Sequence, residues 1–185
     1  KLDGQNKKKE KVKGDMQVVI AYNTPRKMSL MEMQGPLLAM IMGKNLPMPD
    51  WLNGTPENHQ KSFHSKSELT DIYSDTLTKQ RATLGWFTDY MPDLNQSNPL
   101  VANYLIQNTI WWVEYVHLAG IRMDTYSYPD MYFMTEWTRR MMEEYPNLNI
   151  VGEEWSENPA IVSHWQRGKQ NRSGYISYMP SVMDF

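Results

Sequence analysis

The apolar residues between positions 98 and 118 recur at every third or fourth place, which predicts an amphipathic helix. Asn98 and Pro99 form a typical helix start, with an Asn cap followed by Pro at the first helical position. Gly120 is the expected end of this helix, since glycine commonly follows a helix C-terminus. The predicted apolar face contains Val101, Leu105, Trp112, Tyr115 and Ala119.

Short apolar runs then alternate with two further helical patterns. Strands are predicted over 121–124, 148–152 and 175–183, and helices over 129–145 and 159–167. This alternation with short links is typical of the βα units of a parallel sheet, so the expected fold class is α/β. In such sheets, and in (β/α)₈ barrels, functional groups gather at the carboxyl ends of the strands.

The first half of the chain has a weaker pattern. Residues 1–15 are rich in lysine and are expected to form a solvated end, and 16–22 contain a β-branched run that could be a strand. The segment 23–43 is apolar without a clear period and is broken at Gly35-Pro36. Residues 44–90 are mostly polar and punctuated by proline, which predicts a loop-rich region.

The net charge, the absence of cysteine and the lengths of the apolar runs limit the functional classes that this chain could belong to. The chain has 185 residues, a net charge of −2 and no cysteine, so neither nucleic-acid binding nor a disulfide or thiolate site is indicated. No apolar run approaches the roughly 20 residues that span a bilayer. His59 and His64 could indicate a metal pair, but their spacing and the lack of a third ligand favour solvated or locally bonded histidines.

A candidate site lies at the ends of two predicted strands. Asp124 ends the run GIRMD and Glu153 lies in VGEEW, so adjacent strands would bring their carboxylates to one edge of the sheet. Glycoside hydrolysis needs such a pair. Arg122, on the same side of its strand as Asp124, is expected to keep that carboxylate ionised, whereas Trp155 and Glu154 are expected to raise the pKa of Glu153. A buried Arg–Asp pair with a solvent-exposed Glu is the structural alternative.

These motifs resemble a known family. GIRMD (120–124) and VGEEW (151–155) closely resemble the second and third sequence regions of glycoside hydrolase family 13, the α-amylase family. MPDLN (91–95) is similar to the additional region of its neopullulanase and cyclomaltodextrinase branch. PMPDWLN (47–53) and the run 111–130 resemble neopullulanase-type α-amylases of Bacteroides-like bacteria.

The resemblance covers about residues 44–185 and implies a partial catalytic barrel. We expect a fragment of a (β/α)₈ TIM barrel, about strands 3 to 6, with a loop-rich insertion after strand 3. The expected organisation is an unassignable segment over 1–43, an insertion over 44–90 and barrel βα units over 91–185. The sequence of residues 23–43 lacks the Asn-His pair of the family's first region, and we interpret this segment as frameshifted.

The resemblance also implies site roles. Asp124 is the expected nucleophile, Glu153 the acid/base, and Arg122 the residue that orients the nucleophile and keeps it ionised. Trp155, Tyr126 and Tyr128 are the expected substrate-binding residues.

The implied activity is retaining hydrolysis of α-glucans derived from starch, of pullulan or of cyclodextrins. No cofactor is expected; calcium occurs in the family, but this sequence shows no compact acidic loop for it. The implied partner is an α-glucan oligosaccharide, and dimerisation of full-length relatives is compatible with the resemblance. A periplasmic or other location outside the cytoplasm is plausible for relatives of this type, and the chain shows no signal peptide.

The altered first region and the position of the fourth region depart from the family pattern and leave alternatives open. The fourth region, with its His-Asp pair, lies beyond Phe185, so we expect the chain alone to be inactive and to expose apolar helix faces. A non-catalytic carbohydrate-binding relative, with Trp86 added to the aromatic surface, is the alternative from another class. Within enzymes, an oligo-1,6-glucosidase or a 4-α-glucanotransferase is the alternative.

Overall fold

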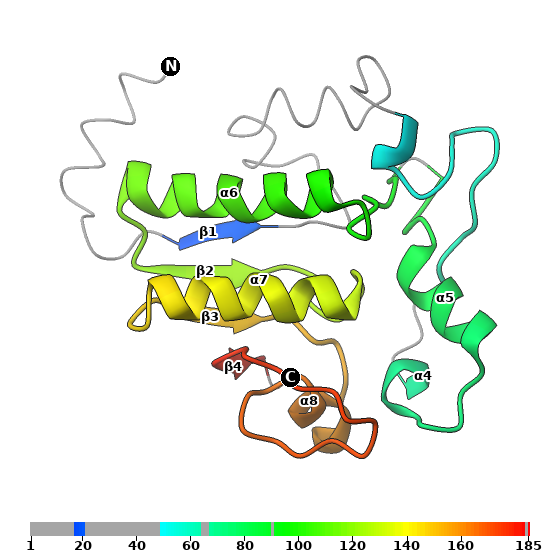
Figure 1. The fold of residues 1–185 in the computed structure, drawn as a ribbon. Helices are drawn as coiled ribbons and strands as arrows, with labels where there is room; N and C mark the ends of the chain where they lie inside the picture. Colours follow the sequence, from blue (N-terminus) through cyan, green and yellow to red (C-terminus); the bar gives the residue numbers. More distant parts are fainter. Residues whose placement is uncertain (1–16, 21–48, 64–66, 90, 184) are drawn as a thin grey trace.

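The computed structural model describes residues 17–20, 49–63, 67–89, 91–183 and 185 (Figure 1). The predictions of a lysine-rich end and of a frameshifted stretch therefore lie outside the described residues, as does His64.

A parallel sheet of four strands in sequence order forms the centre of the described structure. Its strands are β1 (Gln17–Ile20), β2 (Gly120–Met123), β3 (Asn149–Gly152) and β4 (Ser181–Val182). The register pairs Ile20 with Met123 and Met123 with Gly152. The first three strands therefore end level with one another, and the chain leaves all three at the same edge of the sheet.

The predicted strand over 175–183 is wrong for most of its length. Only Ser181–Val182 pairs with β3. The preceding residues bond to the end of the neighbouring helix instead, because Ser177 Oγ donates to the Trp165 carbonyl and Arg167 N–H donates to the Met179 carbonyl.

Helix α6 (Pro99–Val116) confirms the predicted start. The Asn98 side chain accepts from Leu100 N–H at 2.9 Å, and Pro99 occupies the first turn. The helix ends two residues before the predicted end at about Leu118, because His117 and not the expected Gly120 takes the left-handed conformation, with φ 53°, that closes it.

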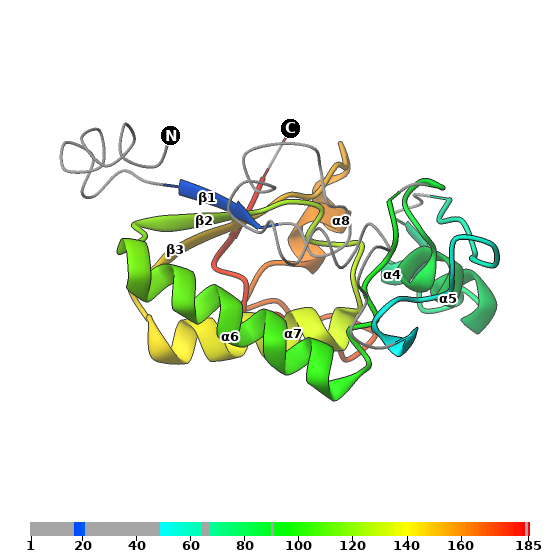
Figure 2. The same cartoon turned by 90° about the horizontal axis from the view of Figure 1, so that it is seen from above.

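Helix α7 (Met131–Glu144) lies beside α6 on one face of the sheet (Figure 2). Asp130 caps it by accepting from Phe133 N–H at 2.8 Å. Trp137 Nε1 donates to Thr109 Oγ1 at 3.1 Å and ties the two helices together. The buried residues of α7 recur at helical spacing: Phe133, Met134, Trp137, Thr138 and Met141. Helix α8 (Pro159–His164) is shorter than the helix predicted over 159–167.

One flank of α6 remains exposed. Trp111 and Tyr115 stack with their ring centroids 4.6 Å apart, yet half or more of each residue is accessible to solvent. Leu100 and Tyr104 are also exposed on this helix. This agrees with the expectation of an exposed apolar helix face.

The region predicted to be loop-rich contains three short helices: η1 (Pro49–Trp51), α4 (Ser67–Thr70) and α5 (Thr76–Leu84). Sequence periodicity misses α5 because only Ala82 of this helix is buried. Its start is set locally, since Asp75 accepts from both the N–H and the hydroxyl of Thr78. None of the helices that the structure describes combines the length and the apolar composition needed to cross a bilayer.

Asp93 connects this region to the rest of the chain. Its fully buried side chain accepts from Asn53 Nδ2 at 2.6 Å, and Asn53 N–H donates to the Asp93 carbonyl at 3.0 Å. Burial raises the pKa of Asp93 well above its ordinary value of 3.8; the Asn53 hydrogen bond opposes the shift and the charge of Asp130 adds to it. A carboxyl of this kind favours its neutral form in the fold.

Gly152 is required by a close contact at the end of β3. A Cβ at this position would lie 2.9 Å from Cγ of Tyr126, whose ring is completely buried. The turn that follows β2 therefore folds directly onto the end of β3, next to Glu153.

We predict that Gly152→Ala lowers the free energy of unfolding by about 1–3 kcal/mol, as overpacking of a filled core does. Chemical denaturation measures the loss. The matched background is Tyr126→Ala, in which the clashing ring is absent and the same glycine substitution should cost little. An equal cost in both backgrounds would contradict the contact.

We also predict that Asp93→Asn raises the free energy of unfolding at pH 7. Because the folded pKa of Asp93 is raised, its contribution to stability is complete below about pH 3.8 and is lost as the pH rises. Asparagine mimics the neutral acid, so the gain over the native chain should shrink on acidification to pH 4. The control is Asp89→Asn, because Asp89 is exposed and pairs with Lys61 at 2.8 Å. A gain in the control variant but not at Asp93 would refute the assignment.

Candidate active site

Strand register brings Asp124 and Glu153 together. Each residue directly follows the paired positions Met123 and Gly152 at the carboxyl ends of β2 and β3. Main-chain bonds continue past the strands, since Glu153 N–H donates to the Met123 carbonyl at 2.9 Å. Both side chains are almost completely buried, with 3% of the Asp124 side chain and none of the Glu153 side chain exposed.

Arg122 contacts both carboxylates. Its Nη2 lies 2.9 Å from Glu153 Oε2, and its Nη1 lies 3.5 Å from Asp124 Oδ2. Arg122 reaches them because alternate residues of a strand share one face. The sequence prediction paired Arg122 with Asp124 alone, and the structure shows a shorter ion pair with Glu153.

Glu153 accepts hydrogen bonds at both of its oxygens. Thr125 N–H donates to Oε2 at 3.1 Å, and the indole N–H of Trp155 donates to Oε1. Together with Arg122, these donors hold the carboxylate of Glu153 through three neighbouring residues.

The expectation of a raised pKa for Glu153 is wrong in this structure. Burial does act to raise it, but the interaction with Asp124, the hydrogen bonds from Thr125 and Trp155 and the charge of Arg122 together hold the pKa below its ordinary value of 4.5. The orientation of Trp155 is the part of this result that differs from the prediction. Its indole presents a polar N–H rather than an apolar face to the carboxylate, and therefore favours the charged form.

Trp155 is an exposed aromatic residue at this edge of the sheet, with 55% of its surface accessible. It stacks on Phe185, with ring centroids 4.2 Å apart and an interplanar angle of 7°. An accessible ring next to a carboxylate has the geometry that binds a sugar by stacking.

The other aromatic residues expected at a sugar-binding surface are buried. Tyr126 is completely buried against Gly152, and Tyr128 is 8% exposed with its ring edge-on to Phe87. Trp86 is 2% exposed and stacks on His59. Tyr126 and Trp86 thus offer no accessible ring face in this structure, so their roles are in packing.

The carboxylates near the site affect the pKa of Tyr128. Burial, with the nearby charges of Glu154 and Glu153, raises the pKa of Tyr128 to about 12. Its phenol therefore stays protonated at neutral pH.

Sequence reasoning missed Thr125 and Phe185. Thr125 has φ 51°, and nothing in the residue type signals this conformation. Phe185 could have been found only as an aromatic residue that follows the last predicted strand.

Among the described residues no group of three or more His, Asp or Glu side chains could hold a metal ion. His59 is locally bonded, as the sequence favoured: its Nδ1 lies 3.0 Å from the Thr55 carbonyl and its Nε2 lies 3.3 Å from Asp89.

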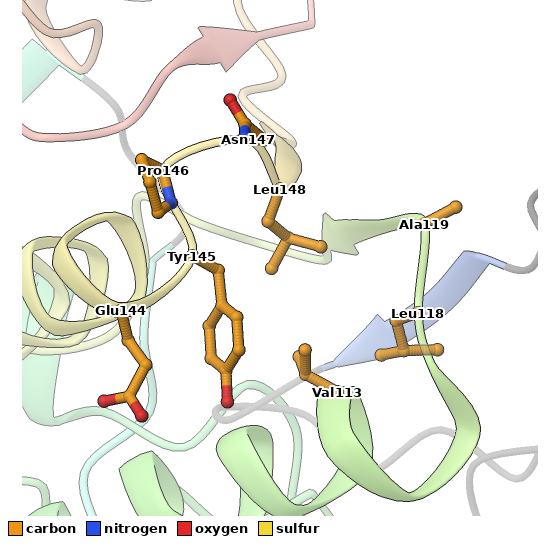
Figure 3. Close-up of a pocket in the computed structure, with 8 residues that line it drawn as sticks. All are labelled: Val113, Leu118, Ala119, Glu144, Tyr145, Pro146, Asn147 and Leu148. Carbon is orange, nitrogen blue, oxygen red and sulfur yellow. The ribbon is translucent and has the colours of Figure 1, made fainter.

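A hollow of about 430 Å³ lies at the opposite ends of the strands (Figure 3). The α6–β2 link lines one side, with Leu118 and Ala119, and the α7–β3 link lines the other, with Pro146 and Leu148. It has no contact with the carboxylates and is separate from the candidate site.

Comparisons with known proteins were made on sequence and on structure. The chain is 29% identical over 126 residues to an intracellular maltogenic amylase of Bacillus subtilis, which is 66% of this chain and 20% of that protein. It is 30% identical over 128 residues to a maltogenic α-amylase of Bacillus acidopullulyticus, 69% of this chain and 19% of that protein. No family model matches the chain.

The fold resembles a solved α-amylase of Anoxybacillus with a TM-score of 0.58 and 23% identity, over 96% of this chain and 32% of that structure. A cyclomaltodextrinase of a Bacillus species also matches, and the predicted resemblance to the α-amylase family, neopullulanase- and cyclomaltodextrinase-like, is confirmed. The chain spans about a fifth of the length of the curated relatives it matches.

We predict that Arg122→Leu lowers the free energy of unfolding by about 3–5 kcal/mol at pH 7, because it leaves two buried carboxylates without a cation. The loss should shrink below about pH 4.5: a lowered folded pKa means that the ion-paired Glu153 contributes stability above that pH and loses it on acidification.

Chemical denaturation at pH 7 and pH 4 measures both effects. Arg139→Leu is the matched control, because Arg139 forms surface ion pairs of 2.7 Å with Glu136 and Glu143 on α7. Surface pairs contribute little, so this variant should stay close to the native chain. Equal losses for the two variants would contradict the buried ion pair.

Proposed function

We propose that this chain, which is similar to glycosidases of the α-amylase family over about two thirds of its length, supplies the nucleophile and acid/base strands of a retaining α-glucoside hydrolase. The observation that carries the proposal is the buried Asp124–Arg122–Glu153 cluster at the carboxyl ends of two adjacent parallel strands.

The proximity of the two carboxyl groups favours retention. In inverting glycosidases the carboxyl groups stand about 6.5–9.5 Å apart to leave room for water, whereas in retaining ones they are about 5–5.5 Å apart. Here Asp124 and Glu153 both contact the guanidinium of Arg122, at 3.5 and 2.9 Å, and this shared contact supports the shorter separation.

We assign Asp124 as the nucleophile and Glu153 as the acid/base. Asp124 attacks the anomeric carbon and forms a glycosyl ester while Glu153 protonates the leaving oxygen. Glu153 then takes a proton from water, which releases the sugar from Asp124. Arg122 supplies the fixed positive charge that compensates both carboxylates.

The lowered pKa of Glu153 imposes a condition on this cycle. A general acid must carry a proton before the first step, yet Arg122, Thr125 and Trp155 favour the ionised form of Glu153 in this structure. We infer that substrate raises the pKa of Glu153 by drawing Trp155 onto the sugar and by excluding water.

The names of the relatives support the substrate class that we propose. Those that match are named maltogenic amylases and cyclomaltodextrinases, and a solved α-amylase of Geobacillus thermoleovorans with a TM-score of 0.55 is described in complex with acarbose. We propose an α-glucan derived from starch, a cyclodextrin or pullulan as the substrate, with Trp155 as the stacking residue next to the bond that is cleaved.

The finer organisation is part of the proposal. We assign the four strands to about strands 3 to 6 of a (β/α)₈ barrel, with residues 44–90 as an insertion after strand 3 and 91–185 as the βα units that carry the site. The all-parallel order, with α6 and α7 on one face of the sheet, supports this assignment.

A carbohydrate-binding relative without catalysis is the second candidate. The burial of Tyr126 and Trp86 removes most of the aromatic surface that it would use. The buried carboxylate pair therefore favours the enzyme.

We predict that Glu153→Gln, in the protein that carries this chain, lowers turnover of maltooligosaccharides by orders of magnitude. The loss should be much smaller for an aryl α-glucoside whose leaving group needs no proton. Asp124→Ala should abolish turnover of both substrates. Release of reducing sugar and of the aryl group measures the rates.

The matched control is Glu154→Gln, which alters the adjacent buried carboxylate. Its effect should be small and should not depend on the leaving group. A loss at Glu154 that depends on the leaving group, with near-normal turnover in Glu153→Gln, would remove Glu153 from the mechanism.

A further inference from the structure

Thr125 adopts a backbone conformation that its residue type disfavours. Its φ of 51° lies in the left-handed region, which β-branched residues rarely occupy. It directly follows Asp124 and is 3% exposed. Strained conformations persist where the surroundings hold them, and they concentrate at functional sites.

Packing and hydrogen bonding by neighbouring residues stabilise the turn around Thr125. The ring of Tyr126 packs on Gly152, and Tyr128 N–H donates to the Thr125 carbonyl at 3.0 Å. Burial of Tyr126 thus offsets the local cost of the left-handed residue.

The conformation turns two successive N–H groups toward one residue. Thr125 N–H donates to Glu153 Oε2 at 3.1 Å, and Tyr126 N–H donates to the Glu153 carbonyl at 3.0 Å. In an extended strand successive N–H groups point to opposite sides, so both could not reach Glu153.

We propose that Thr125 is a positioning residue: its left-handed backbone fixes the Glu153 carboxylate against Arg122 by an N–H bond to the oxygen that the guanidinium also contacts. The catalytic meaning of this bond rests on the proposed function, whereas the bond itself does not. The other groups that face the carboxylate are Asp124 and Trp155.

The direct test deletes the N–H alone. Replacing Thr125 by its α-hydroxy acid converts the amide to an ester and leaves the side chain unchanged. The same replacement at Tyr126 is the control, because it deletes the neighbouring N–H bond to the main chain of Glu153. ¹³C NMR of the Glu153 carboxyl, assigned by its loss in Glu153→Gln, follows the titration.

The ester at 125 should lower the acid dissociation constant of Glu153 roughly tenfold, the effect of losing one hydrogen bond to a charged group. The ester at 126 should leave this constant unchanged while lowering stability. Equal shifts in both esters, or no shift at 125, would overturn the proposal.

A second measurement needs no modified backbone. In the native chain the Thr125 amide proton should titrate with the same midpoint as the Glu153 carboxyl, and this titration should vanish in Glu153→Gln. A chemical shift of the Thr125 amide proton that does not change as Glu153 titrates would also overturn the proposal. Neither measurement uses turnover, so failure of the hydrolase proposal would be seen separately, in the activity of Glu153→Gln.

Discussion

The ion pairs between Arg122 and the carboxylates of Asp124 and Glu153 are the interactions on which the site depends. Two acidic side chains with almost no exposure are costly to ionise unless a cation and hydrogen-bond donors compensate them. Arg122 lies 2.9 Å from one and 3.5 Å from the other. The level ends of β2 and β3 bring all three side chains to one place, so sheet register decides whether the charges can be buried at all.

The rest of the described structure supports that register. Strands of four residues have little stability alone, and α6 and α7 supply the buried surface that holds them. The turn after β2 adds a second constraint, since Tyr126 fits only against a glycine at 152. Around Glu153 the donors favour the ionised form of the carboxylate.

The sequence predicted the features that depend on periodicity and on motifs. The helical spacing of apolar residues located α6 and α7, and the acidic strand ends located the carboxylates. It missed α5, because a helix that buries little carries no apolar period. It misjudged the pKa of Glu153, because residue types do not tell whether Trp155 turns its ring face or its N–H toward the carboxylate. The sequence also placed Tyr126 among the sugar-binding residues. It could not predict the burial of this ring, because burial depends on contacts with residues far along the chain. The left-handed Thr125 has no sequence signal of its own.

Trapping the covalent intermediate would test the central claim most directly. An α-glucosyl fluoride with a second fluorine at C5 forms the glycosyl–enzyme but slows its hydrolysis, and mass spectrometry of peptides then locates the sugar. In the protein that carries this chain, the account predicts one fluoroglucosyl group, attached to Asp124. Attachment to Glu153 or to another residue, or steady turnover of the reagent with no labelled peptide, would contradict the account.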